Sequence, residues 1–434
     1  MPDHKLVFPH GAVRRTQMRG TRNSPHETLG LNDILADTPE YPIQYALFTA
    51  YHMDEQYLLR HINPTAEVAL IAQHTTNETV RHVTRLLPEL PKPDVQLMHT
   101  KLMLLYYANS MRFVVLTGNF IPNDWTVVQN SVFVQDFHRN HDKVFPANEF
   151  STTLAYALHD LGVPKGFIAM MNNVDFSLAV ARIVTSVPSS GDKYLGQRNM
   201  DEYGVERLAS IVKSLGVDKQ NHGINARNID GFAPNARLYC TGSSLGPMDD
   251  KWLCDMYLAA HGINHSRCAH PVNPLVLPWN MVDIGVAFPT QKQVDQSLFN
   301  VAKETVYLKP QYYYNREFPK TSLVCLRPRV ARTLVHAKVI LASFGERQRD
   351  GWMYLGSHNF TPAAWGRMRV GGKIHRETYF NNYELGVVLD SIEFRSMGND
   401  QMEIDVFWNG RKVGLPFRYV WEPYSRDDVP YLNG

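Results

Sequence analysis

The sequence predicts an α/β protein made of two halves of similar plan, each a layered sandwich of sheet and helices. Three observations predict this class. With 434 residues, the chain exceeds what one hydrophobic core usually supports, so two domains are expected. Segments of strand character alternate with segments of helix character. A pattern of His-x-Lys, apolar run, polar turn, apolar run and Asn occurs twice, in residues 99–119 and 336–359.

The first half contains strands and helices in an order that fits such a sandwich. Apolar residues at helical spacing or in strand-like runs mark each element. In chain order we expect helices over 31–38 and 54–62, strands over 66–75, 95–107 and 112–119, and a helix over 151–162. The turn Ala-Asn-Ser between the last two strands indicates a hairpin. A mixed polar and apolar stretch over 172–188 follows, and the domain boundary is predicted there.

The second half repeats the plan. In chain order we expect a strand over 236–242, a helix over 249–262, a strand over 274–278, a helix over 291–303, strands over 333–343 and 352–357 joined by a turn, and a last strand over 383–390. Each half should therefore form its own sheet covered by helices. We expect an N-terminal domain over 28–175 and a C-terminal domain over 176–434, with the two motif copies face to face.

The first 27 residues differ from the rest, because arginines lie among polar residues there. We expect residues 1–27 to form an exposed arm that is able to contact a polyanion. The arginines are Arg14, Arg15, Arg19 and Arg22.

Composition indicates a globular protein, since 44% of the residues are hydrophobic and 20% are charged. The formal net charge of +2 predicts that a polyanion would be held by a local basic groove. No apolar run is long enough for a membrane span, and the first residues lack a signal-peptide core. The cysteines lack the spacing of a zinc finger or a disulfide scaffold, so we expect reduced thiols inside the cell. They are Cys240, Cys254, Cys268 and Cys325.

The repeated motif brings an imidazole and an ammonium group together. On a strand, residues i and i+2 share one face, so His99 would stand beside Lys101, and His336 beside Lys338. A neighbouring lysine keeps the pKa of the imidazole from rising, which leaves a neutral nitrogen that is able to attack. Asn119 and Asn359 follow at the ends of the next strands, where their amides would reach the same place.

Both copies together would surround one point with two imidazoles, two ammonium groups and two amides. A phosphoryl group gains negative charge on its oxygens in the transition state, and such donors stabilise it. In other enzymes, one donor of this kind contributes about 3 kcal/mol. We therefore expect an enzyme that cleaves a phosphate ester without a metal ion or another cofactor.

At these residues the chain resembles the phospholipase D superfamily, in which two His-x-Lys motifs build one site. The lipid-hydrolysing members carry Asp five residues after the lysine, and this chain has Tyr106 and Ser343 there. That departure, together with Asn119 and Asn359, resembles the tyrosyl-DNA phosphodiesterase branch. The segments SSLG, DDKWLC, SHNFTPAAWG, NYELGVVL and PYSRDDVPYLNG agree with it. The resemblance runs from about residue 28 to the C-terminus and implies two phospholipase-D-like α-β-α sandwich domains related by pseudo-twofold symmetry.

The resemblance implies catalytic roles for matching residues. His99 would be the nucleophile that forms a phosphohistidine, and His336 would protonate the leaving group and then activate water. The phosphate oxygens would be held by Lys101, Lys338, Asn119 and Asn359.

Two further matches concern residues that orient the imidazoles. Glu384 matches an acidic residue of the family that would fix an imidazole. The glutamine of the family falls at Gln129 when one residue is deleted, whereas Asn130 stands at the ungapped position.

The family also implies contacts with the substrate. Hydroxyls and lysines would follow the phosphates of the DNA strand without reading its sequence. The matching residues are Lys101, Lys338, Thr241, Ser244, Ser357 and Thr361. Familiar relatives have an aromatic residue four positions before the nucleophile that stacks on a base. This chain has Val95 there, so the sequence leaves base stacking at that position open.

The resemblance implies a DNA repair enzyme that works in the nucleus, including on single-strand breaks. Its substrates would be single-stranded or duplex DNA 3′ ends that carry the tyrosine or a peptide remnant of topoisomerase I, or another blocking adduct. The product would be a 3′-phosphate, in an exonuclease-like removal of the end group. No membrane partner is expected, and the chain is expected to act as a monomer.

Several alternatives remain open from the sequence. A lipid phosphodiesterase or a nuclease of the same superfamily would use the same motif. A protein that binds DNA ends without catalysis is the alternative outside enzymes. GSSLG over 242–246 fits the G-x-S-x-G elbow of a serine hydrolase with Ser244 as nucleophile. A metal site could be drawn from residues that otherwise read as a polar loop. These residues are His261, His265, Cys268 and His270.

Overall fold

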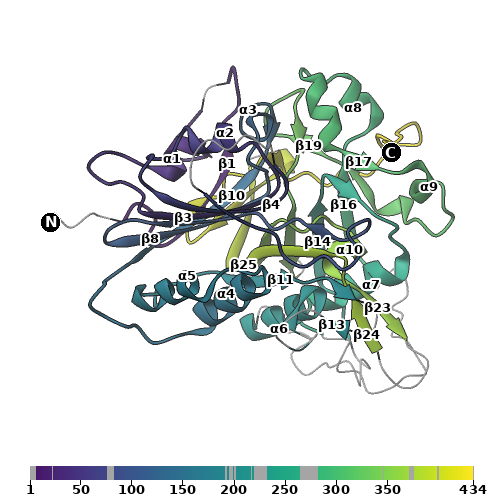
Figure 1. Cartoon of the computed structure of the whole chain (residues 1–434). Coiled ribbons are helices and arrows are strands. Elements are labelled where there is room, and N and C mark those ends of the chain that lie inside the picture. The colour runs from purple at the N-terminus through teal and green to yellow at the C-terminus, as the bar shows by residue number, and fades with distance from the viewer. Residues whose placement is uncertain are drawn as a thin grey trace.

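Two mixed β-sheets with helices packed against them make up the protein (Figure 1). The computed structural model describes residues 6–21, 23–75, 83–190, 193–194, 199, 202–216, 218, 232–263, 282–345, 347–370, 376–397 and 400–433. The α/β class predicted from the sequence is confirmed. Among these residues, no helix combines the length and the apolar character needed to cross a membrane.

The first sheet has the strand order β2-β1-β10-β8-β7-β3-β4-β5. Its strands are β1 (Ala12–Thr16), β2 (Thr28–Leu29), β3 (Tyr45–Met53), β4 (Glu67–Thr75), β5 (Thr84–Leu86), β7 (Leu102–Tyr106), β8 (Ser110–Leu116) and β10 (Ser131–His138). All of it comes from the first third of the chain.

The second sheet has the order β18-β16-β14-β21-β22-β25-β26-β27, and β6 and β11 also pair with the long strand β25. Its strands are β6 (Leu97–Met98), β11 (Arg182–Ser186), β14 (Ala236–Thr241), β16 (Ile284–Phe288), β18 (Leu323–Cys325), β21 (Val339–Phe344), β22 (Asp350–Gly356), β25 (Asn382–Met397), β26 (Asp400–Trp408) and β27 (Arg411–Lys412).

The two sheets repeat one pattern of pairing. In the first, β5, β4 and β3 are parallel, and β7, β8 and β10 continue from β3 in antiparallel fashion. In the second, β18, β16 and β14 are parallel, and β21, β22 and β25 continue in antiparallel fashion. The hairpin β7–β8 therefore corresponds to β21–β22, and each hairpin directly follows the His-x-Lys of one copy of the motif.

Shorter strands form two-stranded pairs. They are β12 (Ser189–Ser190) with β13 (Lys193–Tyr194), β15 (Ser244–Leu245) with β17 (Tyr307–Leu308), β19 (Arg327–Pro328) with β28 (Phe417–Arg418), β20 (Leu334–Val335) with β9 (Val128–Gln129), and β23 (Arg367–Val370) with β24 (Arg376–Tyr379). The pair of β20 with β9 joins the two halves.

The helices cover the sheets in layers. They are α1 (Leu31–Leu35), α2 (Glu55–Leu59), α3 (Pro122–Thr126), α4 (Glu149–Asp160), α5 (Lys165–Ala169), α6 (Gly204–Leu215), α7 (Asp250–Ala260), α8 (Gln291–Asp295), α9 (Pro310–Tyr313) and α10 (Pro362–Trp365), with 3-10 turns at Met170–Asn173, Asn300–Thr305 and Lys320–Ser322. Helices α1 to α3 share a core with one face of the first sheet, and α6, α7 and α10 share another core with one face of the second. The core between them takes side chains from both sheets and from α4.

The sequence explains where α4 begins and which face it buries. The side chain of Asn148 accepts a hydrogen bond from the main-chain N–H of Ser151, which caps the first turn. Phe150, Leu154 and Leu158 recur at a spacing of four residues and are buried against the sheets.

The structure differs from the sequence-based expectation at three helices or strands. Residues 99–101 lie between β6 and β7 rather than inside one strand. The chain leaves its pairing with β25 at the end of β6 and enters the first sheet at the start of β7. The same break separates β20 from β21 at the second motif. The helix expected over 291–303 ends at Asp295, and a 3-10 turn follows from Asn300. The strand expected over 274–278 lies outside the described residues.

The exposed arm expected over residues 1–27 also differs from the structure. Residues 12–16 form β1, which pairs with β10 in the first sheet. Ala12 and Val13 are buried in the core, and the guanidinium of Arg15 forms an ion pair with Glu27. Arg19 is exposed, and Arg22 lies outside the described residues.

Candidate active site

A short strand directly precedes each His-x-Lys, and this strand pairs with the opposite half of the protein. Before the first copy, β6 runs parallel to the start of β25, and the N–H of His99 donates to the carbonyl oxygen of Tyr383 at 3.0 Å. Before the second copy, β20 runs parallel to β9, and the N–H of His336 donates to the carbonyl oxygen of Gln129 at 2.8 Å. This exchange brings both histidines to the boundary between the halves.

The two lysines lie in equivalent places and are completely buried. The Nζ of Lys101 donates to the carbonyl oxygen of His99 at 2.8 Å, and the Nζ of Lys338 donates to that of His336 at 2.7 Å. Burial lowers the pKa of Lys101 to about 8 and that of Lys338 well below its usual range, and Lys101 lowers the latter further. The site therefore holds a protonated Lys101 beside a lysine that gives up its proton easily.

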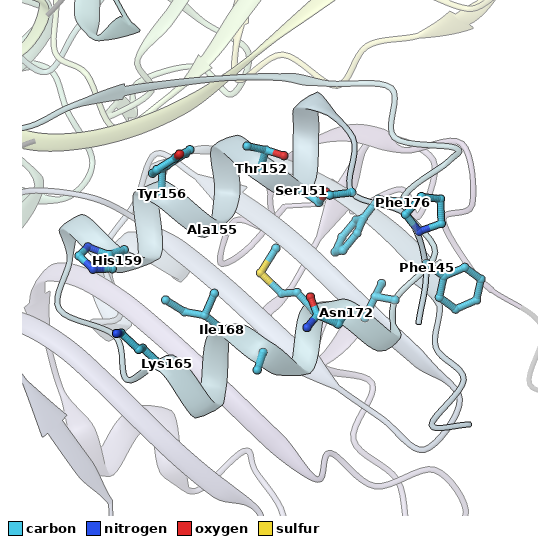
Figure 2. Close-up of a pocket in the computed structure, with 15 residues that line it drawn as sticks. Phe145, Ser151, Thr152, Ala155, Tyr156, His159, Lys165, Ile168, Asn172 and Phe176 are labelled. Atoms are coloured by element: carbon cyan, nitrogen blue, oxygen red, sulfur yellow. The ribbon is translucent and has the colours of Figure 1, made fainter. Parts of the chain in front are cut away.

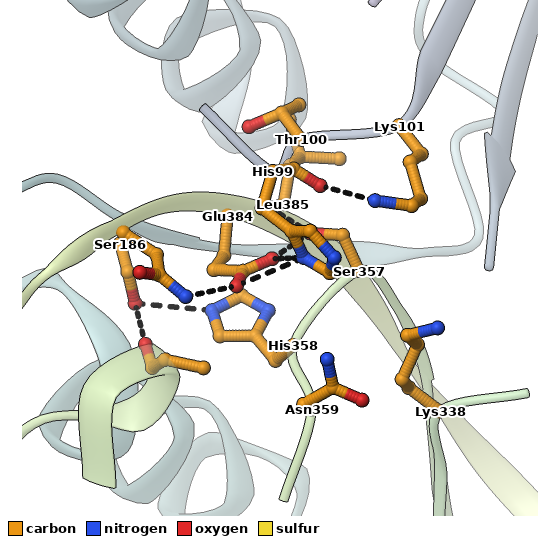
Figure 3. Close-up of polar contacts among 12 residues, drawn as sticks. His99, Thr100, Lys101, Ser186, Lys338, Ser357, His358, Asn359, Glu384 and Leu385 are labelled. Atoms are coloured by element: carbon orange, nitrogen blue, oxygen red, sulfur yellow. Dashed lines mark hydrogen bonds and ion pairs between the residues drawn. The ribbon is translucent and has the colours of Figure 1, made fainter. Parts of the chain in front are cut away.

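His99 is held by a carboxylate from the second half (Figure 3). Its Nδ1 lies 2.9 Å from Oε2 and 3.1 Å from Oε1 of Glu384. Because a carboxylate only accepts, Nδ1 carries the hydrogen and Nε2 keeps its lone pair. Burial lowers the pKa of His99 to about 4; Glu384 opposes this shift, whereas Lys101 strengthens it. The ring is neutral near pH 7.

Glu384 stays ionised although it is buried. Burial alone would raise its pKa, but the interaction with His99, including its hydrogen bond, together with His358 and Lys101, lowers the pKa to about 2. Ser357 donates its hydroxyl to Oε2 at 2.5 Å, and Asn382 donates its amide to Oε1 at 2.9 Å. These bonds fix the carboxylate in the orientation that His99 needs.

His336 is held by an amide from the first half. Its Nδ1 lies 3.1 Å from Oδ1 of Asn130, whose Nδ2 donates to the carbonyl oxygen of Asp124. The amide is thus oriented with its oxygen towards the ring, so Nδ1 carries the hydrogen. The Nε2 accepts from the Nζ of Lys338 at 3.1 Å. Both imidazoles therefore present an unprotonated Nε2.

Groups from both copies of the motif act on the pKa of His336. Burial is the largest cause that lowers its pKa well below the usual range, and the charge of Lys338 follows. Lys101 and His99, from the other copy, lower it further. The Nζ of Lys338 also donates to the carbonyl oxygen of Thr117, inside the first copy, at 3.2 Å, so the two copies meet at one site.

Asn119 and Asn359 end their strands in matching positions. The Oδ1 of Asn359 accepts from the main-chain N–H groups of Ser243 and Ser244, each at 3.1 Å. The Oδ1 of Asn119 accepts from the main-chain N–H of His52 at 3.3 Å. Since both oxygens face the main chain, the NH2 groups are the parts of these amides that are able to donate to a ligand.

Some residues expected to bind substrate have other partners in the structure. Ser357 is fully buried against Glu384. The hydroxyl of Thr241 donates to the carbonyl oxygen of Ala337 at 3.1 Å, and that of Thr361 accepts from the N–H of Ala364 and caps α10. The hydroxyls of Ser357 and Thr241 thus donate within the protein, whereas the hydrogen bond of Thr361 uses only its acceptor, and contact of these residues with substrate stays a prediction. Ser244 is half-buried beside Asn359.

Gln129 is another expectation that the structure does not support. Its side chain donates to the hydroxyl of Thr333 at 2.7 Å instead of meeting His336. In β9 the main chain of Gln129 pairs with β20, so the next residue, Asn130, turns towards the imidazole. The ungapped position is therefore the one beside the ring.

Asp124 is a residue that the sequence analysis missed. Its Oδ2 accepts from the main-chain N–H of Asn119 at 2.6 Å and from the amide of Asn119 at 3.1 Å, and lies 3.7 Å from Nδ1 of His336. A signal was present, because NFIPNDW at 119–125 matches NFTPAAW at 359–365. The repeat thus extends past the asparagines, and Asp124 is one of three positions at which these segments differ, with Ala364 in its place.

The alternative sites receive little support. The turn that carries Ser244 serves as the support of Asn359. His261 is buried and paired with Asp218, and His265, Cys268 and His270 lie outside the described residues. In the part of the chain that the structure describes, no three His, Cys, Asp or Glu side chains are grouped to hold a metal ion. Cys240, Cys254 and Cys325 are buried, and none of them forms a disulfide with another described residue.

A separate pocket of about 570 Å³ lies between α4 and α5 (Figure 2). Its walls include Tyr156, His159, Lys165 and Ile168 but no residue of the motif. It therefore plays no part in the site described above.

Comparison with known proteins adds to this geometry. The family model described as tyrosyl-DNA phosphodiesterase matches residues 12–425. Tyrosyl-DNA phosphodiesterase 1 of Arabidopsis thaliana is 23% identical over 382 residues, which cover 77% of this chain and 58% of that protein. The Drosophila melanogaster protein of the same name is 24% identical over 374 residues, covering 81% of this chain and 59% of that protein. The chain thus spans less than two thirds of the length of these relatives.

A solved structure shows the same fold. The crystal structure of the yeast tyrosyl-DNA phosphodiesterase superposes with a TM-score of 0.70 and 15% identity, covering 98% of this chain and 100% of the yeast chain. At this identity, the likeness establishes the arrangement of the two sheets and their helices.

Proposed function

Since this chain belongs to the tyrosyl-DNA phosphodiesterase family, we propose that it hydrolyses the phosphodiester bond between a tyrosine of topoisomerase I and the 3′ end of DNA. Other adducts that block a 3′ end would be removed in the same way, and the product would be a 3′-phosphate. The observation that carries the proposal is the pair of buried, neutral imidazoles, each with its Nδ1 held by the opposite half of the protein.

In the first step, Nε2 of His99 attacks the phosphorus. The phosphorus–nitrogen bond forms while the bond to the tyrosine oxygen breaks, and that oxygen takes a proton from Nε2 of His336. The product is a phosphohistidine that links DNA to the protein. Lys101, Lys338 and the amides of Asn119 and Asn359 donate to the phosphate oxygens as their negative charge grows.

The substrate itself prepares His336 for this role. In the absence of a phosphate its ring is neutral, and Nε2 accepts from Lys338. A phosphodiester between the rings brings a negative charge that offsets the lysines and draws the Nζ of Lys338 to its oxygens. Both effects raise the pKa of His336 and free Nε2, which takes up a proton from solvent before the first step; the water of the second step replaces that proton for the next turnover.

In the second step, water attacks the phosphorus of the phosphohistidine. The Nε2 of His336, now without its proton, accepts a proton from the water, and the phosphorus–nitrogen bond breaks. The 3′-phosphate leaves, and His99 is restored. Every donor and acceptor in both steps comes from the chain itself, so no metal ion is required.

We also propose the wider setting. The enzyme acts in nuclear DNA repair on single-stranded or duplex 3′ ends, with the DNA strand passing Ser244 beside Asn359. One chain supplies both histidines, which supports action as a monomer. The domain boundary between residues 175 and 176 is supported by β11, which joins the second sheet directly after it.

The proposal is tested with an oligonucleotide that carries a 3′-phosphotyrosine. The purified chain should release a 3′-phosphate oligonucleotide at the same rate with and without EDTA, and should leave phosphatidylcholine intact. Faster hydrolysis of phosphatidylcholine would assign the chain to lipid chemistry. Loss of activity in EDTA would contradict the mechanism.

A further inference from the structure

Three rings that belong to no motif stand beside the proposed nucleophile. The ring centroid of Tyr51 lies 5.8 Å from that of His99, 4.5 Å from that of His52 and 4.9 Å from that of His74. The rings of His52 and His74 lie 5.0 Å apart and are nearly parallel, with 25° between their planes. His52 and His74 are exposed, and Tyr51 is half-buried.

We infer that His52 and His74, with Tyr51 behind them, form a subsite that stacks on the aromatic ring of the leaving group. This inference rests on the proposed function and deepens it, since it names the part of the adduct that the enzyme recognises. Three steps support it: the place of the rings in the sheet, the approximate twofold symmetry, and the chemistry of the side chains.

The sheet places the two imidazoles side by side at the mouth of the site. His52 near the end of β3 is the register partner of His74 near the end of the parallel strand β4. The main chain of His52 is fixed on both sides, because its N–H donates to Asn119 and its carbonyl oxygen accepts from the N–H of Phe120. Asn119, which is proposed to bind the phosphate, thus also holds the main chain of His52, and this keeps the ring of His52 close to the reacting phosphate.

The approximate twofold symmetry of the protein shows on which side of the site these rings lie. Thr49 donates its hydroxyl to the carbonyl oxygen of Thr100, as Thr241 does to that of Ala337. Continuing along the two strands, the main chain of His52 supports Asn119 as that of Ser244 supports Asn359. His52 and Ser244 therefore occupy corresponding places on opposite sides of the site.

A phosphodiester has two ester arms, and a site with approximate twofold symmetry offers each arm its own path. If the DNA strand passes the small hydroxyl residues Ser243 and Ser244, the second arm passes Tyr51 and His52. Hydroxyls suit a phosphate backbone, whereas flat rings suit a phenol. Burial, and then the charges of His74 and Lys101, lower the pKa of His52, so its ring is neutral and does not compete for the phosphate.

The test compares two adducts on the same oligonucleotide, 3′-phosphotyrosine and 3′-phosphoglycolate, whose leaving group has no ring. For the double variant His52→Ala, His74→Ala, we expect kcat/KM on the tyrosyl substrate to fall about 3- to 10-fold, mainly through KM. The glycolate substrate should be cleaved as by the wild type. The double variant His52→Phe, His74→Phe should restore the tyrosyl activity, and His159→Ala, an exposed histidine on α4, serves as control.

The possible results separate this inference from the function on which it rests. An equal loss on both adducts, or no loss on either, would overturn the subsite while leaving the tyrosyl activity of the wild type in place. A loss that follows the identity of the last base would assign the rings to the DNA strand instead. A wild-type chain that is inert on the tyrosyl substrate would contradict the proposed function itself.

Discussion

The Nδ1 of His99 lies 2.9 Å from Oε2 of Glu384, although the two residues belong to opposite halves of the protein. The converse relationship joins His336 to Asn130 of the first half. Each half therefore orients the imidazole that the other half supplies. The partners are not equal, since one is a carboxylate and the other a neutral amide. This asymmetry distinguishes the proposed nucleophile, His99, from the proposed acid and base, His336, in a site whose other groups are arranged symmetrically.

Glu384→Gln should lower kcat about 10- to 100-fold, because an amide lacks the charge that keeps the hydrogen on Nδ1 of His99. The fold should persist, since Ser357 and Asn382 are still able to bond to the side chain. Single-turnover rates on the 3′-phosphotyrosyl oligonucleotide measure the effect. Glu393→Gln is the matched control, because Glu393 lies on the same strand with an exposed side chain. Equal rates for the two variants would show that Glu384 does not orient His99.

His99→Ala should abolish turnover, because the variant lacks the Nε2 that is proposed to attack the phosphorus. Among the described residues, no other side chain is held by Glu384 so that a free ring nitrogen faces the phosphate. The melting temperature should also fall, because the buried carboxylate of Glu384 loses the hydrogen bond from Nδ1 of His99, so turnover is measured well below the melting transition. The control is His138→Ala, which removes an exposed histidine at the end of β10. Turnover like that of the wild type would mean that a different atom attacks the phosphorus.

His336→Asn or His336→Arg should permit the first attack but slow the second step, because the base that activates water is missing. Denaturing gels of the variant with a labelled oligonucleotide should then show DNA bound covalently to the protein. The double variant His99→Ala, His336→Asn should show no such band. Absence of the band in the single variants under every condition of turnover would contradict the phosphohistidine scheme.

The pH dependence of kcat/KM should be bell-shaped, since it reports groups of the free enzyme. His99 has a pKa of about 4 and must be neutral, so activity falls as the pH drops through about 4. Lys101 has a pKa of about 8 and must be charged, so activity falls as the pH rises through about 8. Lys101→Arg keeps its charge at higher pH and should move the alkaline limb upward, at reduced activity. An alkaline limb that does not move would assign it to another group.

The sequence alone was sufficient for the fold class and for the meeting of the two motifs. A duplicated pattern requires equivalent surroundings, and the matching hairpins β7–β8 and β21–β22 provide them. The side-chain partners of the two histidines could not be predicted from the duplicated pattern. Gln129 and Asn130 are both polar, and only the pairing of β9 with β20 decides which of them faces His336.

The partners of two hydroxyl groups could not be predicted from the sequence. Thr241 and Ser357 became candidates for substrate contact through the family resemblance, which does not reveal their partners in the fold. A buried turn must satisfy its own main-chain and carboxylate groups first, and these two hydroxyls do so. The arginines at residues 14 and 15 concealed β1 in a similar way, because their long side chains reach the edge of the sheet while the flanking residues enter the core.

Asp124→Asn tests the residue that the second copy of the repeat lacks, since Ala364 stands at the matching position. The carboxylate accepts from the main chain and the amide of Asn119 and lies 3.7 Å from Nδ1 of His336. An amide in its place would present hydrogens to one of these donors, so Asn119 should lose its fixed orientation. We expect kcat/KM to fall about 10-fold, which corresponds to the loss of one hydrogen bond to a charged group. Asp142→Asn, at an exposed position, is the control. If Asp124→Asn lowered the melting temperature without changing kcat/KM, Asp124 would serve the fold and not the orientation of Asn119.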